Sequence, residues 1–168
     1  MPLSHPLLRW PQAPFSLTLI LCIGLVAGGV VMSEFFRLAA CPLCVIQRML
    51  YLLLAALAVP GLFVARFAIA RRLIALAMAA SAGTGIFVAG YQTWLQRFAL
   101  AEGCSGYQTW WEEFVDWAGE KVPLLFLSDG ICSDPGWKFL SLSIAEWSLI
   151  MFSGLLALAL YAALRAGR

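Results

Sequence analysis

The sequence has few charged residues of either sign, and that shortage excludes several classes of protein. Only 12 % of the 168 residues are charged, whereas 62 % are hydrophobic and mean hydropathy is +0.88. Soluble domains are about a quarter charged and about half apolar. The composition therefore excludes a nucleic-acid-binding protein, a disordered tail and an ordinary cytosolic enzyme. It indicates a membrane protein, and the length favours a single domain.

Four apolar segments are long enough to cross a bilayer, which takes about 20 helical residues. We expect spans at about residues 15–33, 44–64, 73–95 and 146–164, with outer loops at about 34–43 and 96–145. Each span should be helical, because the bilayer offers the backbone no water. The prediction is an all-α, polytopic membrane protein, in which residues 1–168 form a single membrane domain, a four-transmembrane-helix bundle.

Small residues and one proline interrupt these spans. Gly24 with Gly28, and Ala79 with Gly83, are pairs four positions apart, a spacing typical of faces where membrane helices approach closely. Pro60 is expected to end or kink the second span near its far end.

One side of this topology has no acids at all. The charged residues of the two tails and of the loop between the second and third spans are all basic. They are Arg9, Arg66, Arg71, Arg72, Arg165 and Arg168. Every Asp and Glu lies on the other side. Because Lys and Arg near the spans favour the cytoplasm, both termini should be cytoplasmic. The outer loops should then face an oxidising compartment, where disulfides persist.

The second span begins with the sequence Cys41-Pro42-Leu43-Cys44. Proline is favoured at the first helical position, so Cys41 should lie near the cap and Cys44 in the first turn. A helix N-terminus favours negative charge, which makes a cysteine there reactive. Arg48 follows Cys44 by four residues and should share its helix face. It would stabilise a Cys44 thiolate or polarise the carbonyl of a bound electron acceptor.

Other interpretations of the same residues, without a redox role, remain open. The cysteine pair could hold a metal, although zinc takes about four Cys or His ligands and the one histidine, His5, lies on the other side. The pair could also form an inert structural disulfide, and Arg48 could be a snorkelling interface residue. Cys22, alone in the first span, is expected to be a small packing residue.

The long second outer loop contains Cys104 and Cys132. Between them Trp110, Phe114 and Trp117 recur at helical spacing, with most acids on other faces. This pattern predicts a short amphipathic, interfacial helix on the bilayer surface, and an aromatic belt without a special role is the alternative. Turn residues flank both cysteines, and a mobile loop with an exposed disulfide would suit exchange with another protein.

This combination resembles the DsbB family of the bacterial inner membrane, over essentially the whole chain. The resemblance implies a quinone-dependent, protein-disulfide-generating oxidoreductase that reoxidises a DsbA-like periplasmic thiol oxidase. It implies that the thiolate of this partner attacks a Cys104–Cys132 disulfide, with Cys104 in the mixed disulfide. Electrons would then pass to Cys41–Cys44, with Cys44 facing the quinone and Arg48 near a quinone oxygen.

Two glutamines complete the site that the resemblance implies. Gln47 precedes Arg48, where family members often carry Glu or Gln. Gln92 stands where many members have a histidine that helps to bind quinone, and its amide can donate to a carbonyl. The expected cofactor is ubiquinone or menaquinone. Membrane lipid is expected to contact the protein, and neither a metal nor nucleic acid is expected to bind it. A non-catalytic membrane adaptor with structural disulfides and a metal carrier are the alternative functions.

Overall fold

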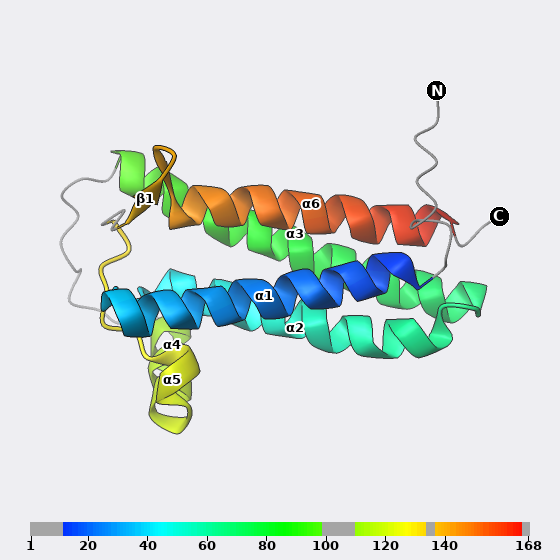
Figure 1. Cartoon of the computed structure of the whole chain (residues 1–168), viewed down its shortest axis with the longest axis horizontal. Helices are drawn as coiled ribbons and strands as arrows, with labels where there is room; N and C mark the ends of the chain where they lie inside the picture. The colour runs from blue at the N-terminus through cyan, green and yellow to red at the C-terminus, as the bar shows by residue number, and fades with distance from the viewer. Residues whose placement is uncertain (1–11, 99–109, 134–136, 166–168) are drawn as a thin grey trace.

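The computed structural model describes residues 12–98, 110–133 and 137–165. Four long helices form an antiparallel bundle: α1 (Ala13–Phe36), α2 (Pro42–Val64), α3 (Ala68–Phe98) and α6 (Ile144–Leu164). Each is long and apolar enough to cross a membrane. The chain is thus a multi-pass, all-α membrane protein, which confirms the predicted class (Figure 1).

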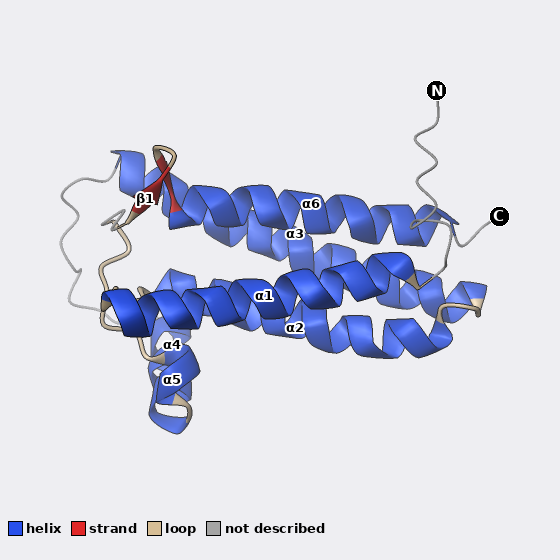
Figure 2. Cartoon of the chain, viewed as in Figure 1, coloured by secondary structure: helices blue, strands red, loops and turns tan. Residues whose placement is uncertain are grey.

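Two short helices and a hairpin lie at the end of the bundle at which α2 begins. Helix α4 (Trp110–Lys121) and helix α5 (Pro123–Phe126) lie against α2 and project to one side of the bundle (Figure 1). Strands β1 (Lys138–Phe139) and β2 (Leu142–Ser143) pair antiparallel just before α6 (Figure 2). Helix α4 confirms the short helix predicted from aromatic spacing, and Trp110, Phe114 and Trp117 are all exposed on it.

Helix α3 is longer than predicted at both ends, and Arg71 explains its early start. The Arg71 guanidinium donates to the backbone oxygens of Ala65 and Arg165, at 3.1 and 3.0 Å. These bonds hold the charged first turn of α3 against the ends of α2 and α6. Pro60 is expected to end or kink α2 near its far end; it does not end the helix, which continues to Val64.

The core contains two rings that each lie against a glycine of a neighbouring helix. A Cβ atom added at Gly61 would be 2.3 Å from the Phe15 ring, and one added at Gly85 would be 2.3 Å from the Phe152 ring. Both phenylalanines are fully buried. The prediction of close approach at Gly24, Gly28 and Gly83 is wrong, because no described atom outside the local helix lies within 4 Å of a Cβ at these positions.

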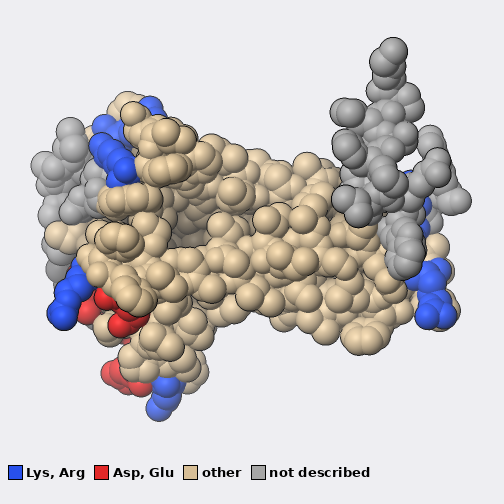
Figure 3. Space-filling view, viewed as in Figure 1, with Lys and Arg blue, Asp and Glu red and all other residues tan. Residues whose placement is uncertain are grey.

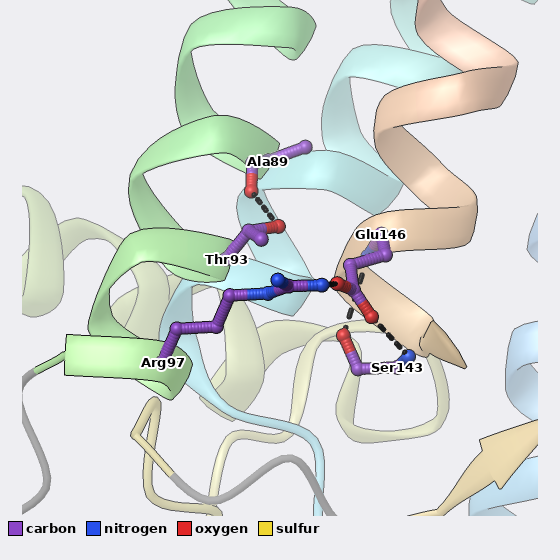
Figure 4. A network of polar contacts seen from close by, with 5 residues as sticks. All are labelled: Ala89, Thr93, Arg97, Ser143 and Glu146. Atoms are coloured by element: carbon purple, nitrogen blue, oxygen red, sulfur yellow. Dashed lines mark hydrogen bonds and ion pairs between the residues drawn. The ribbon is translucent and has the colours of Figure 1, made fainter. Parts of the chain in front are cut away.

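A polar network joins α3 to α6 at the same end of the bundle (Figure 4). Ser143 caps α6 by accepting from the backbone N–H of Glu146, and the Glu146 carboxylate accepts from the backbone N–H of Ser143. This reciprocal arrangement satisfies two backbone donors at the helix start. Arg97, in the last turn of α3, forms an ion pair with the same carboxylate. The network fixes the end of α3, the helix that carries Gln92, against the start of α6.

Candidate active site

The first turn of α2 holds two sulfur atoms side by side. Cys41 is the N-cap residue and Pro42 follows at the first helical position, as the sequence predicts. The Cys41 sulfur accepts from the backbone N–H of Cys44 at 3.3 Å, and the two sulfur atoms lie 2.7 Å apart. A backbone donor in the first turn of the helix therefore bonds one of two sulfurs that are close enough for bond exchange.

A third sulfur reaches this pair from the second outer loop. The backbone N–H of Gly130 donates to the backbone oxygen of Ala40 at 3.0 Å, and this contact docks the loop on the segment before α2. Cys132 then lies near the Cys41 thiol and the backbone N–H of Leu43, and interacts with both. The described cysteines of both outer loops thus meet at one point.

Interactions within the cluster shift the pKa values of Cys41 and Cys132 in opposite directions. The bond to Cys41 and the backbone donor hold the pKa of the Cys132 thiol below its usual value, against the opposing effect of burial. Hydrogen bonds to Cys132 and Cys44, with burial, raise the pKa of Cys41. Cys41 is therefore the proton-bearing sulfur, and Cys132 has the thiolate character that favours both attack and departure in disulfide exchange. Cys104 lies outside the described residues.

Arg48 lies one turn deeper than Cys44, and three backbone or side-chain oxygens hold its guanidinium. It donates to the oxygens of Gly29 and Ser33 on α1, at 2.9 and 2.6 Å, and to the backbone oxygen of Leu125 on α5, at 3.1 Å. The guanidinium passes close to Gly29, where an added Cβ would lie 3.4 Å from the Arg48 Nε atom, an ordinary van der Waals contact. No carboxylate among the described residues pairs with this charge.

Two buried glutamine amides lie between α2 and α3 beside the sulfurs. The Gln47 Nε2 atom donates to Gln92 Oε1 at 2.7 Å. The Gln92 Nε2 atom lies 3.1 Å from the sulfurs of both Cys41 and Cys44 and donates to them. The sequence placed Gln92 among the quinone ligands, and the structure places its amide against the sulfur pair.

A mostly apolar cavity opens beside these groups, between α1, α2 and the start of α6. Its volume is about 410 Å³, within the range of small-molecule pockets. Cys44, Gln47 and Arg48 form part of its wall, whereas Gln92 is not among the lining residues. Most of the wall is carbon. Further polar and aromatic groups, for which the sequence assigned no role, are Ser33, Tyr51, Trp137, Phe139, Trp147 and Ser148.

One sequence signal could have revealed part of this wall. Gly29 and Ser33 are four positions apart in α1 and face the same side, where the Ser33 hydroxyl donates to the Gly29 oxygen at 2.7 Å. A polar residue in a span marks a face that is turned towards protein. The described residues include no group of three or more His, Cys, Asp or Glu side chains that could hold a metal ion.

Fold and site together define a polytopic membrane protein with clustered thiols beside an apolar cavity. The family model described as Disulfide bond formation protein DsbB matches residues 11–162 of this chain. Proteins named Disulfide bond formation protein B are similar over most of their length. That of Dechloromonas aromatica is 39 % identical, with 88 % of each chain covered, and that of Nitrosospira multiformis is 35 % identical, with 83 % of each covered. The chain therefore belongs to the DsbB family.

Proposed function

We propose that this protein is a quinone-dependent thiol oxidase that reoxidises a DsbA-like periplasmic dithiol protein. The observation that carries the proposal is the meeting of Cys132 with Cys41 and Cys44 beside a cavity lined by Cys44 and Arg48. Family membership supports it, since the relatives are named for disulfide bond formation. The arrangement connects an outer loop, which a soluble partner can reach, to an apolar pocket.

Electrons enter through the outer loop by thiol–disulfide exchange. A thiolate of the partner attacks the Cys104 sulfur of a Cys104–Cys132 disulfide, and Cys132 leaves as a thiolate. The Cys132 thiolate attacks Cys41 of the Cys41–Cys44 disulfide and releases the Cys44 thiolate. The lowered pKa of Cys132 and its contact with Cys41 support this step.

The partner's second thiol then completes the exchange. It displaces Cys104 from the mixed disulfide, and the Cys104 thiolate attacks Cys132 and restores the loop disulfide. Cys41 is released with a proton. In sum, the partner loses two electrons and two protons to form its disulfide. The Cys41–Cys44 disulfide takes up the two electrons and one proton to give a Cys41 thiol and a Cys44 thiolate, and the other proton goes to solvent.

The cavity fits a quinone as the final acceptor. Its wall is largely apolar, as a quinone ring and tail require, and Cys44 and Arg48 supply reactive and polar groups. A guanidinium carries five N–H donors, of which three are bonded to described oxygens. We assign Arg48 to bind a quinone oxygen, with Gln47 nearby. A bound ubiquinone or menaquinone would accept two electrons and two protons and so return the reduced cysteine pair to its disulfide.

The charges support one orientation in a bacterial inner membrane. Figure 3 shows only basic side chains among the described residues visible at the end that holds the α2–α3 turn, and both signs at the end that holds α4. Basic residues favour the cytoplasmic side. The sulfurs would then face the periplasm, with both termini in the cytoplasm and Trp110, Phe114 and Trp117 against the bilayer surface.

The test follows thiols in a reconstituted reaction. Purified protein in lipid nanodiscs is mixed with a reduced DsbA-like protein, with and without quinone, and free thiols are trapped with a maleimide. We expect quinone-dependent oxidation of the partner, lost in Cys44→Ala and kept in the matched control Cys22→Ala, because Cys22 is buried in α1 away from the cluster.

Three results would contradict the proposal. Oxidation that persists in Cys44→Ala would place the chemistry elsewhere. No turnover by the native protein would indicate an adaptor with structural disulfides. Stoichiometric metal that competes with thiol labelling would indicate a metal carrier.

A further inference from the structure

The glutamine pair is buried more deeply than any other polar group that touches the sulfurs. Gln92 is 2 % exposed and Gln47 is 5 % exposed. Gln92 donates to both sulfurs and accepts from Gln47. We propose that Gln92 is a catalytic residue that sets the reduction potential of the Cys41–Cys44 pair, and that Gln47 is the positioning residue that holds its amide towards the sulfurs. The inference rests on the proposed function, because it assigns a redox role to that pair.

The bonding fixes which end of the Gln92 amide faces the sulfurs. An amide has two N–H donors and one carbonyl acceptor, and at Gln92 each of the three has a partner. The Gln47 donor occupies the carbonyl, so the amide cannot turn without losing that bond. A disulfide and a thiolate have no proton to donate, and only the N–H end can therefore bond the sulfurs in both states.

The same bonds favour one redox state. Reduction of the Cys41–Cys44 disulfide takes up two electrons and one proton and gives a Cys44 thiolate with a Cys41 thiol. A hydrogen bond to an ion is about twice as strong as one between neutral groups, and burial strengthens it further. The Gln92 amide therefore stabilises the reduced pair over the disulfide. That makes the pair a stronger oxidant, which draws electrons from the incoming Cys132 thiolate.

Gln92 contacts the sulfurs from outside the cavity wall. It reaches the sulfurs from α3 and is absent from the cavity wall, whereas Cys44 and Arg48 line that wall. The amide thus contacts the Cys44 sulfur without forming part of the cavity that an acceptor would occupy. The effect of Gln92 should therefore be measurable as a property of the sulfur pair without any quinone.

The experiment measures that potential directly. Cys104 and Cys132 are changed to serine, and the protein in quinone-free nanodiscs is equilibrated with glutathione redox buffers before maleimide labelling. We expect Gln92→Leu to reduce the equilibrium constant for reduction of the pair about tenfold, which is a potential roughly 30 mV more negative. The matched control, Gln96→Leu, removes an amide one turn further along α3 that has no described bond to either sulfur, and should leave the potential unchanged.

Gln47→Glu tests the positioning role while Gln92 stays in place. A carboxylate only accepts, so the Gln92 amide would turn to donate to it and would present its oxygen to the sulfurs. The potential should shift in the same direction as in Gln92→Leu. Gln47→Glu combined with Gln92→Leu should give less than the sum of the two shifts, because both remove the same bonds.

The outcomes separate this inference from the proposed function. A native-like potential in Gln92→Leu would overturn it, as would a shift to a less negative value. If Gln92→Leu does not fold, Gln92→Glu keeps the side-chain size and should shift the potential the same way, so an unshifted Gln92→Glu would also overturn it. A native protein that fails to oxidise its partner with quinone would remove the proposed function, and the potential shift would still be measurable.

Discussion

The two sides of α6 are packed in opposite ways. On the α3 side, the Phe152 ring lies so close to Gly85 that a methyl group would overlap it. On the α1 side, Gly24 and Gly28 have no described neighbour within 4 Å of a Cβ, and the cavity of about 410 Å³ lies there. The same residue type therefore permits close packing at one interface and leaves space at the other. We infer that the interface of α3 with α6 holds the bundle together, and that the space between α1 and α6, beside α2, is part of the proposed ligand site.

Filling the tight interface should have the largest effect on stability. Gly85→Leu forces a side chain into the Phe152 ring, and overpacking of this kind costs about 3 kcal/mol. The free energy of unfolding in mixed micelles measures it. The matched control is Gly83→Leu on the same helix, where an added Cβ would have no described neighbour within 4 Å and the change should stay within about 0.5 kcal/mol. Equal losses in both variants would show that α3 packs uniformly and would remove the contrast.

Arg48 lines the cavity, which lies on the loosely packed α1 side of α6. Its substitution therefore distinguishes an effect on ligand binding from an effect on helix packing. Removal of a donor to a developing negative charge costs about a hundredfold in rate, so we expect Arg48→Ala to reduce quinone use by about that factor. Exchange between the partner and the cysteines should fall much less. Single-turnover rates without quinone, compared with steady-state rates with it, measure the two separately. Equal losses would mean that the bonds to Gly29, Ser33 and Leu125 serve only to join the helices.

Filling the loose interface should have the smallest structural effect. Gly28→Leu places a side chain in the cavity, and its Cβ would have no described neighbour within 4 Å. We expect the KM for quinone to rise about tenfold, which corresponds to about 1.4 kcal/mol, with stability close to that of the native protein. Titration of quinone in the oxidation assay checks the KM. A variant as unstable as Gly85→Leu, or one with native KM, would show that the cavity is not the quinone site.

Much of the fold is predictable from sequence because it follows from local physics. Four apolar stretches without water must be helical, and the structure has four such helices. The cap at Cys41 follows from Pro42, and α4 follows from the spacing of its aromatic residues. The glycine faces were not predictable, because a pair of small residues shows that helices can approach but not which neighbour does so.

The site is less predictable because its contacts are made between distant elements. Cys132 reaches Cys41 through a backbone bond from Gly130 to Ala40, and backbone groups leave no signature in the sequence. Gln92 has the donor expected of a quinone ligand, but its function depends on which side of α3 faces the sulfurs. The rotation of α3 is set by packing along the whole helix, as at Gly85 and Phe152.

The contact between Cys132 and Cys41 is the central claim, because it joins the outer loop to the pair beside the cavity. In Cys44→Ser combined with Cys104→Ser, mild oxidation should give an intramolecular Cys41–Cys132 disulfide, identified by mass spectrometry of the digested protein. Gly130→Ala should lower its yield, because a Cβ at Gly130 would lie 2.4 Å from the Ala39 oxygen and would push the loop away. Formation of that bond is the predicted result. Two thiols that stay free, or that pair only between molecules, would contradict the account.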